Sequence, residues 1–132
     1  MRSRFALLLA ATTLAVGATG CGDGEDLLEE PSLRDCLAGE ELELEPVNVS
    51  GGVVLGSISP DFRLVTPAGE GVDVVVQGTE QKASRTAADI RGSLQAFGAA
   101  DSVVIVNRNA IVVFEGKPSA DLRRRVEDCL DA

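Results

Sequence analysis

The stretch Ser102-Val103-Val104-Ile105-Val106-Asn107-Arg108-Asn109-Ala110-Ile111-Val112-Val113-Phe114 decides the fold. It contains two runs of β-branched residues, which favour extended backbone, on either side of an Asn-flanked turn. We therefore predict two strands joined at Arg108 and Asn109, and we place this hairpin at the centre of the sheet.

Both faces of this hairpin are apolar. Because side chains alternate along a strand, one face carries Val103, Ile105, Ala110, Val112 and Phe114, and the other carries Val104, Val106, Ile111 and Val113. Strands of this kind are expected in a sheet that is covered on both sides. We expect the helices to pack on one side, and residues 53–55 and 62–64 to cover part of the other. The remainder, at Val104, Val106, Ile111 and Val113, is then a possible interaction surface for a protein partner or a second copy.

The flanking sequence predicts further elements on each side of the hairpin. Residues 41–47 alternate as a half-buried strand with Leu42 and Leu44 inward, and Pro46 either makes it an edge strand or ends it. Residues 62–66 and 72–77 predict a second hairpin around a turn rich in Gly and Pro.

Three helices are expected. Ser32 can cap the first, which Gly39 ends, and Ser119 can cap the last. The middle helix spans residues 79–97, and Gly98 closes it. Gly92 lies inside this helix and predicts either close packing or a bend. The inward positions are Leu33, Cys36 and Leu37 in the first helix, Ala83, Ala87, Ile90, Leu94 and Phe97 in the second, and Leu122, Val126, Cys129 and Leu130 in the third.

The order of elements predicts an α+β fold with three helices and a mainly antiparallel sheet of about four or five strands. From residue 72 onward the order is strand, helix, strand, strand, helix. This is typical of a ferredoxin-like split β-α-β unit, in which the last strand of the hairpin inserts between two parallel strands. The analogy concerns architecture and carries no function.

The first residues form a targeting segment. Met1-Arg2-Ser3-Arg4 is a short basic start, and residues 5–18 are an apolar run too short to span a bilayer. The run ends in Ala18-Thr19-Gly20-Cys21, which resembles the lipobox of bacterial lipoproteins. The resemblance implies that Cys21 is acylated at sulfur, becomes the new N-terminus, and anchors the protein at the extracytoplasmic face of the cell membrane. The alternative is an ordinary secretory signal cut nearby.

This organisation divides the chain into three parts. Residues 1–20 are the lipoprotein signal peptide, residues 21–31 are an acidic flexible tether, and residues 32–132 are a single α+β domain. Leu27 and Leu28 interrupt the acidic segment and can start the fold.

Two cysteines remain when Cys21 is acylated. Cys36 and Cys129 lie on the apolar stripes of the first and last helices, and only one pairing is possible. In an exported protein thiols oxidise, so we predict a disulfide between them. A redox-active pair or a metal site is the alternative, although redox pairs usually occur as Cys-x-x-Cys.

Composition narrows the function classes. Removing Arg2 and Arg4 with the signal peptide leaves 10 of the 12 basic residues against 21 acidic ones, a net charge of −11. Such a charge repels phosphate backbones, so nucleic acid is not an expected partner. The run Arg123-Arg124-Arg125 is expected to be a solvated face, the alternative being a phosphate or lipid-headgroup site.

No catalytic motif is recognisable in the sequence. The chain has no His, the usual proton shuttle near pH 7, and no Ser lies in a Gly-x-Ser-x-Gly elbow. We expect no cofactor and a non-enzymatic domain that acts through binding. The alternatives are a structural envelope protein without a discrete ligand and an enzyme of unknown class.

Overall fold

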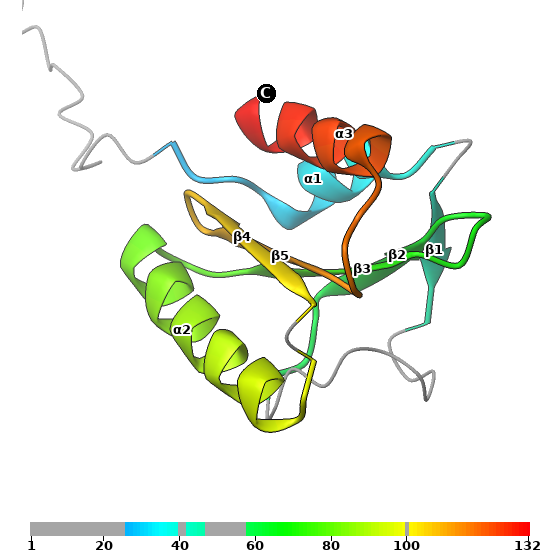
Figure 1. Cartoon of the computed structure of the whole chain (residues 1–132). Coiled ribbons are helices and arrows are strands. Elements are labelled where there is room, and N and C mark those ends of the chain that lie inside the picture. The colour runs from blue at the N-terminus through cyan, green and yellow to red at the C-terminus, as the bar shows by residue number, and fades with distance from the viewer. Residues whose placement is uncertain (1–25, 40–41, 47–57, 100) are drawn as a thin grey trace, which may run out of the picture.

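A computed structural model describes residues 26–39, 42–46, 58–99 and 101–132 of the chain (Figure 1). These residues form an α+β fold with three helices and a five-stranded antiparallel sheet, as the sequence predicts. The helices are α1 (Glu30–Leu37), α2 (Glu80–Ala96) and α3 (Ala120–Asp131), and the strands are β1 (Glu43–Glu45), β2 (Phe62–Val65), β3 (Gly71–Val76), β4 (Val103–Asn107) and β5 (Ala110–Phe114).

The strands lie in the order β1-β2-β3-β5-β4, and every neighbouring pair is antiparallel. The last strand of the predicted hairpin, β5, does insert between β3 and β4. However, the hairpin is not the centre of the sheet, because β4 is an edge strand and β3 holds the middle position. This order does not show the ferredoxin-like arrangement that we predicted.

The sheet lies between two helical layers, with α1 and α3 on one face and α2 on the other (Figure 1). The expectation that all helices share one side is therefore wrong. The core on the α1 and α3 side contains Leu33, Leu37, Leu42, Phe62, Leu64, Val72, Val74, Ala110, Val112, Phe114, Leu122, Val126, Cys129 and Leu130. The core under α2 contains Val75, Ala83, Ala87, Ile90, Leu94, Ile111 and Val113.

This layering places α2 over the hairpin face that we predicted as a possible interaction surface. The two hairpin faces divide as predicted, but Ile111 and Val113 are fully buried against α2. Val104 and Val106 are half-buried beside the same cluster. Phe62 and Leu64 pack on the opposite face, with α1 and α3, and residues 53–55 lie outside the described residues.

The predicted cap at Ser119 is confirmed by geometry, and Thr79 supplies a second cap that we did not predict. The hydroxyls of Thr79 and Ser119 accept hydrogen bonds from Lys82 N and Leu122 N, and so satisfy free N–H groups in the first turns of α2 and α3. Gly98 follows α2 with φ of 75°, which a Gly adopts without strain. The predicted cap at Ser32 is wrong, since α1 begins earlier with Glu29 as its N-cap.

Further placements also differ from prediction, among them Cys36, which is exposed although we predicted it to face inward with Leu33 and Leu37. Phe97 is 67% exposed because it follows the last turn of α2 rather than continuing its apolar stripe. Leu44 is 49% exposed on the short edge strand β1. Gly92 faces open space on α2, so the close packing that we gave as one explanation for it is absent.

The β4–β5 turn holds the N-terminal end of the described chain. Asn109, 2% exposed, accepts a hydrogen bond from Leu28 N and donates to Leu28 O and Gln77 O. Arg108, with φ of 52°, donates to the carbonyls of Asp26 and Leu130. Residues 26–31, the last part of the segment that we predicted as an acidic tether over residues 21–31, therefore belong to the described fold, and residues 21–25 lie outside the described residues.

Burial under α2 yields a test of the fold. Val113→Ser should lower the free energy of unfolding by about 2–4 kcal/mol, because it leaves both a cavity and a buried hydroxyl. Phe97→Ser makes the same replacement at an exposed position and should change stability by less than about 0.5 kcal/mol. Urea unfolding measures both, and equal losses would contradict this placement of α2.

Candidate functional site

The two terminal helices are joined by a disulfide. Cys36 in α1 and Cys129 in α3 are bonded, with Cα atoms 5.8 Å apart and a sequence separation of 93 residues. Cys129 is buried in the core, whereas Cys36 lies at the surface end of the bond. The predicted pairing is present, and it closes the domain between its first and last helices. Cys21 lies outside the described residues.

Closing so long a loop should stabilise the fold. The chain-entropy argument gives about 4–5 kcal/mol for a loop of this size, because the bond restricts the unfolded chain. We therefore expect Cys36→Ser, Cys129→Ser and the double variant to lose similar stability in thermal unfolding, and Cys21→Ser to lose none. Intact mass should rise by about two hydrogens on reduction. Two free thiols in the exported protein under alkylating conditions would refute the bond.

A cluster of buried charges lies on the α2 face of the sheet, toward β1 and β2. Arg63 of β2 donates to both carboxylate oxygens of Asp73 on β3 at 3.0 Å. It also donates to Glu115 at 2.7 Å and to Glu45 of β1 at 3.3 Å. Arg63 is 7% and Asp73 2% exposed. One guanidinium therefore links β1, β2, β3 and the end of β5.

Burial and pairing act in opposite directions on the pKa values of this cluster. Burial raises the pKa of Asp73 above its ordinary value, and the hydrogen bonds from Arg63 offset this only in part. Burial tends to lower the pKa of Arg63, but hydrogen bonds to Glu115 and Asp73 raise it overall, so the guanidinium stays charged.

A glycine makes room for this cluster. A Cβ at Gly71 would collide with the Arg63 guanidinium and the Glu115 carboxylate. The sequence did contain a signal for the cluster. The second predicted hairpin, over residues 62–66 and 72–77, has one charged residue within each of its apolar strands. The register pairs Arg63 directly with Asp73, a pairing that we did not predict.

The charges of this cluster are paired with one another, and their pairing depends on the register of β2 and β3. All three carboxylates accept from the same guanidinium, and each of its three nitrogens donates to at least one of them. Among residues 26–39, 42–46, 58–99 and 101–132, no group of three His, Cys, Asp or Glu side chains is placed to hold a metal ion.

Loss of the guanidinium should destabilise the fold in a pH-dependent way. Arg63→Met should lower the free energy of unfolding by about 3–5 kcal/mol near pH 7, because Asp73 stays buried without its partner. The pKa of Asp73 then rises further. A carboxyl with a raised folded-state pKa contributes stability in acid that is lost as the pH rises through that pKa, so the deficit should shrink as the pH falls toward about 4.

The matched control for this prediction is Arg123→Met. Arg123 forms an exposed pair with Glu127 one turn along α3, at 3.0 Å. Such pairs contribute at most about 1 kcal/mol. Denaturant unfolding at several pH values measures both variants, and a deficit for Arg63→Met that does not change with pH would contradict the assigned role of Asp73.

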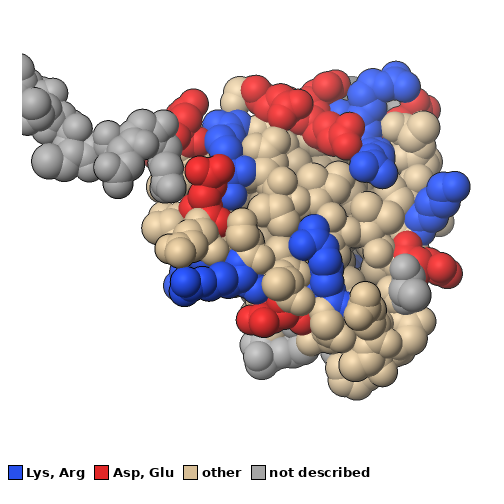
Figure 2. Space-filling model, turned by 60° about the vertical axis from the view of Figure 1, so that its left-hand side comes forward, with Lys and Arg blue, Asp and Glu red and all other residues tan. Residues whose placement is uncertain are grey.

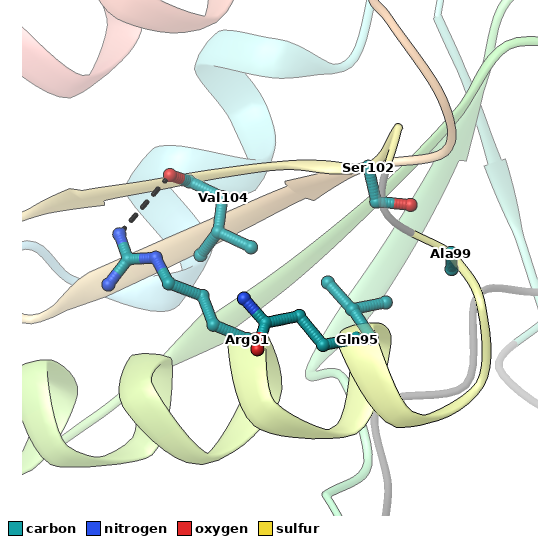
Figure 3. A pocket seen from close by; sticks show the side chains of 6 residues that line it. Arg91, Gln95, Ala99, Ser102 and Val104 are labelled. Carbon is teal, nitrogen blue, oxygen red and sulfur yellow. Dashed lines mark hydrogen bonds between the residues drawn. The ribbon is translucent and has the colours of Figure 1, made fainter.

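A small hollow lies beside the edge strand β4, between it and the C-terminal part of α2 (Figure 3). It measures about 200 Å³ and is lined by Arg91, Leu94, Gln95, Ala99, Ser102 and Val104. Pockets for drug-sized ligands begin at roughly 300 Å³. The hollow is therefore better suited to a side chain of a partner than to a cofactor.

Hydrogen bonding at this hollow shows the orientation of β4. Arg91 donates to the carbonyl of Val104 at 3.4 Å, so this carbonyl points away from β5. In an antiparallel ladder, opposite residues exchange both backbone bonds or neither, alternately along the strand. Val104 and Val106 therefore direct their backbone N–H and C=O groups outward.

Uncharged side chains dominate the edge at β4. Every residue of β4 is half-buried, and its sequence Val-Val-Ile-Val-Asn has no charge. Figure 2 brings the left-hand side of Figure 1 forward and shows a largely uncharged area that contains a few basic side chains, with most acidic residues near its margins. A second, open hollow of about 770 Å³ borders Val103 from the α3 side, with Lys117 and Arg123 in its lining.

The basic run on α3 is engaged within the protein. Arg123 pairs with Glu127, and Arg124 approaches Asp121 at 4.0 Å. Arg125 donates to the carbonyl of Leu37 at 3.5 Å. These contacts favour the prediction of a surface face over a phosphate site.

Comparison with models of known protein families, with curated proteins and with solved structures finds no match. The candidate site is therefore defined by geometry alone. It consists of the β4 edge, the adjoining flank of α2 and the hollow between them.

Proposed function

We propose that this protein is a lipid-anchored extracytoplasmic domain that acts by binding, through the β4 edge and the flank of α2. The extracytoplasmic location is supported mainly by the Cys36–Cys129 disulfide, because such bonds persist in oxidising compartments and are rare in the cytosol. It agrees with the signal-like segment that ends at Cys21.

The anchoring part of the proposal rests on Cys21. Among the described residues, no helix is long and apolar enough to cross a membrane. Acylation would hold the protein at the surface through two lipid chains on one residue, and dual acylation is sufficient for stable anchoring. The described domain then begins five residues later, at Asp26.

The binding part rests on the character of the β4 edge. An edge strand with outward backbone groups is ready to accept another extended strand, and the main-chain hydrogen bonds supply affinity. The hollow between Val104 and Gln95 adds a place for a side chain of the incoming strand.

Lipid attachment can be tested directly. Cells supplied with labelled palmitate should incorporate the label into the wild-type protein, and Cys21→Ala should abolish the labelling. Cys36→Ala and Cys129→Ala are the matched controls and should remain labelled, because their thiols are not the acylated ones. The wild-type protein should also enter the detergent phase. If Cys21→Ala incorporated as much label as the wild type, the proposal that Cys21 carries the lipid anchor would be refuted.

A further inference from the structure

The two edges of the sheet differ in how they are protected. The edge strand β1 reads Glu-Leu-Glu and is followed by Pro46, and charges and proline are common means of preventing strand pairing. The edge strand β4 has neither. Because both edges belong to one sheet, this contrast singles out β4 as the edge that is open to pairing.

We propose that β4 pairs with β4 of a second copy of this chain, in antiparallel register about Ile105, to form a two-fold dimer with a continuous sheet. In this register Val104 lies opposite Val106 of the second copy. Both residues direct their backbone groups outward, so they can exchange both hydrogen bonds. The register of β4 is thus complementary to itself.

Side chains also match in this register. Val104 and Val106 both belong to the α2 face of the sheet, and Ile105 to the opposite face. Pairing therefore places valines beside valines and isoleucine beside isoleucine. Their half-buried surfaces become covered, and contacts between β-branched residues on neighbouring strands stabilise sheets.

The position of α2 fits the same dimer. This helix packs on both β4 and β5, and neighbouring strands lie about 4.8 Å apart. A helix seated over these two strands lies about 5 Å from the two-fold axis, so the two copies of α2 approach to about 10 Å. Helix pairs pack at about 8–10 Å when the residues between them allow it.

The flank of α2 that would meet the second helix is compatible with such an approach. Arg91 and Gln95 mark this flank, since both line the hollow beside β4 (Figure 3). The residues one and two turns earlier on this side, Ala88 and Ser84, are exposed and small. In antiparallel helices the larger residues of one copy can then lie against the smaller residues of the other.

A strand partner must displace the contact between Arg91 and Val104. That hydrogen bond is long, at 3.4 Å. The carbonyl of Val104 would receive the N–H of Val106 of the second copy instead, which preserves its pairing.

The dimer rests on the binding part of the proposed function, for which it names a second copy as the partner, and the proposed anchor agrees with its symmetry. A two-fold axis perpendicular to the sheet leaves α1 and α3 of both copies on the same face (Figure 1). The chain from Asp26 to Leu28 lies at the β4–β5 turn and leads into α1. Both anchors can therefore enter one membrane.

Sedimentation equilibrium of the full chain tests the dimer. The measurement uses a detergent whose density matches that of the solvent, and it applies whether or not Cys21 is acylated. We expect twice the monomer mass for the wild type. Val104→Pro should give the monomer mass, because it removes an outward N–H that β5 does not use. Ala88→Arg should do the same by placing two cations between the helices. Ala68→Arg, in the exposed β2–β3 turn, is the matched control and should remain a dimer.

Cross-linking keeps the proposal testable if these variants fail to fold. A short bis-maleimide should link Ala88→Cys into a dimer and leave Ala68→Cys and the wild type as monomers. A wild-type monomer at all soluble concentrations, or dimers that persist in both Val104→Pro and Ala88→Arg, would overturn the proposal. Loss of palmitate labelling alone would refute the anchor and leave the dimer standing.

Discussion

The double burial of β3 and β5 is the constraint on which the rest of the structure depends. Val72, Val74 and Val112 face one side of the sheet, and Val75, Ile111 and Val113 face the other. A strand with apolar side chains on both faces is stable only when both faces are covered. Since α1 and α3 are held together by a disulfide on one face, α2 must supply the cover on the other.

Where the hydrophobic cluster under α2 ends, the same face of the sheet changes from apolar to charged. Arg63 there joins three carboxylates from β1, β3 and the end of β5. A buried ion pair adds little net stability over apolar packing, since desolvation opposes the Coulomb attraction. However, the ion pairs between Arg63 and its partners require a defined register of the strands. A slip of one residue between β2 and β3 would turn Arg63 into the apolar core on the opposite face, which makes the cluster a constraint on register.

Local sequence predicted local structure well in this chain. The turn at Arg108 and Asn109, the two faces of the hairpin and the cap at Ser119 all follow from residues near one another. The Cys36–Cys129 pairing followed from elimination. The side of the sheet on which α2 packs did not follow, because an amphipathic stripe identifies a buried face of a helix but not the face of the sheet it meets. The positions of Arg63, Asp73 and Asn109 were missed for a related reason. Each is buried by partners in other elements, and Asn109 replaces lost water contacts with hydrogen bonds to Leu28 and Gln77.

The asymmetry between the two edges has a consequence for assembly. A sheet in which both edge strands are open to pairing would allow unlimited addition of copies, as in fibres. Of the two edge strands here only β4 lacks charge, and pairing two β4 strands about a two-fold axis covers the open edge of both copies at once. The continuous sheet would then end in β1 on either side, where Glu43, Glu45 and Pro46 oppose further pairing. An isologous contact of this kind closes on itself. The charged edge strand thus limits association to two copies, and the uncharged edge strand makes that association possible.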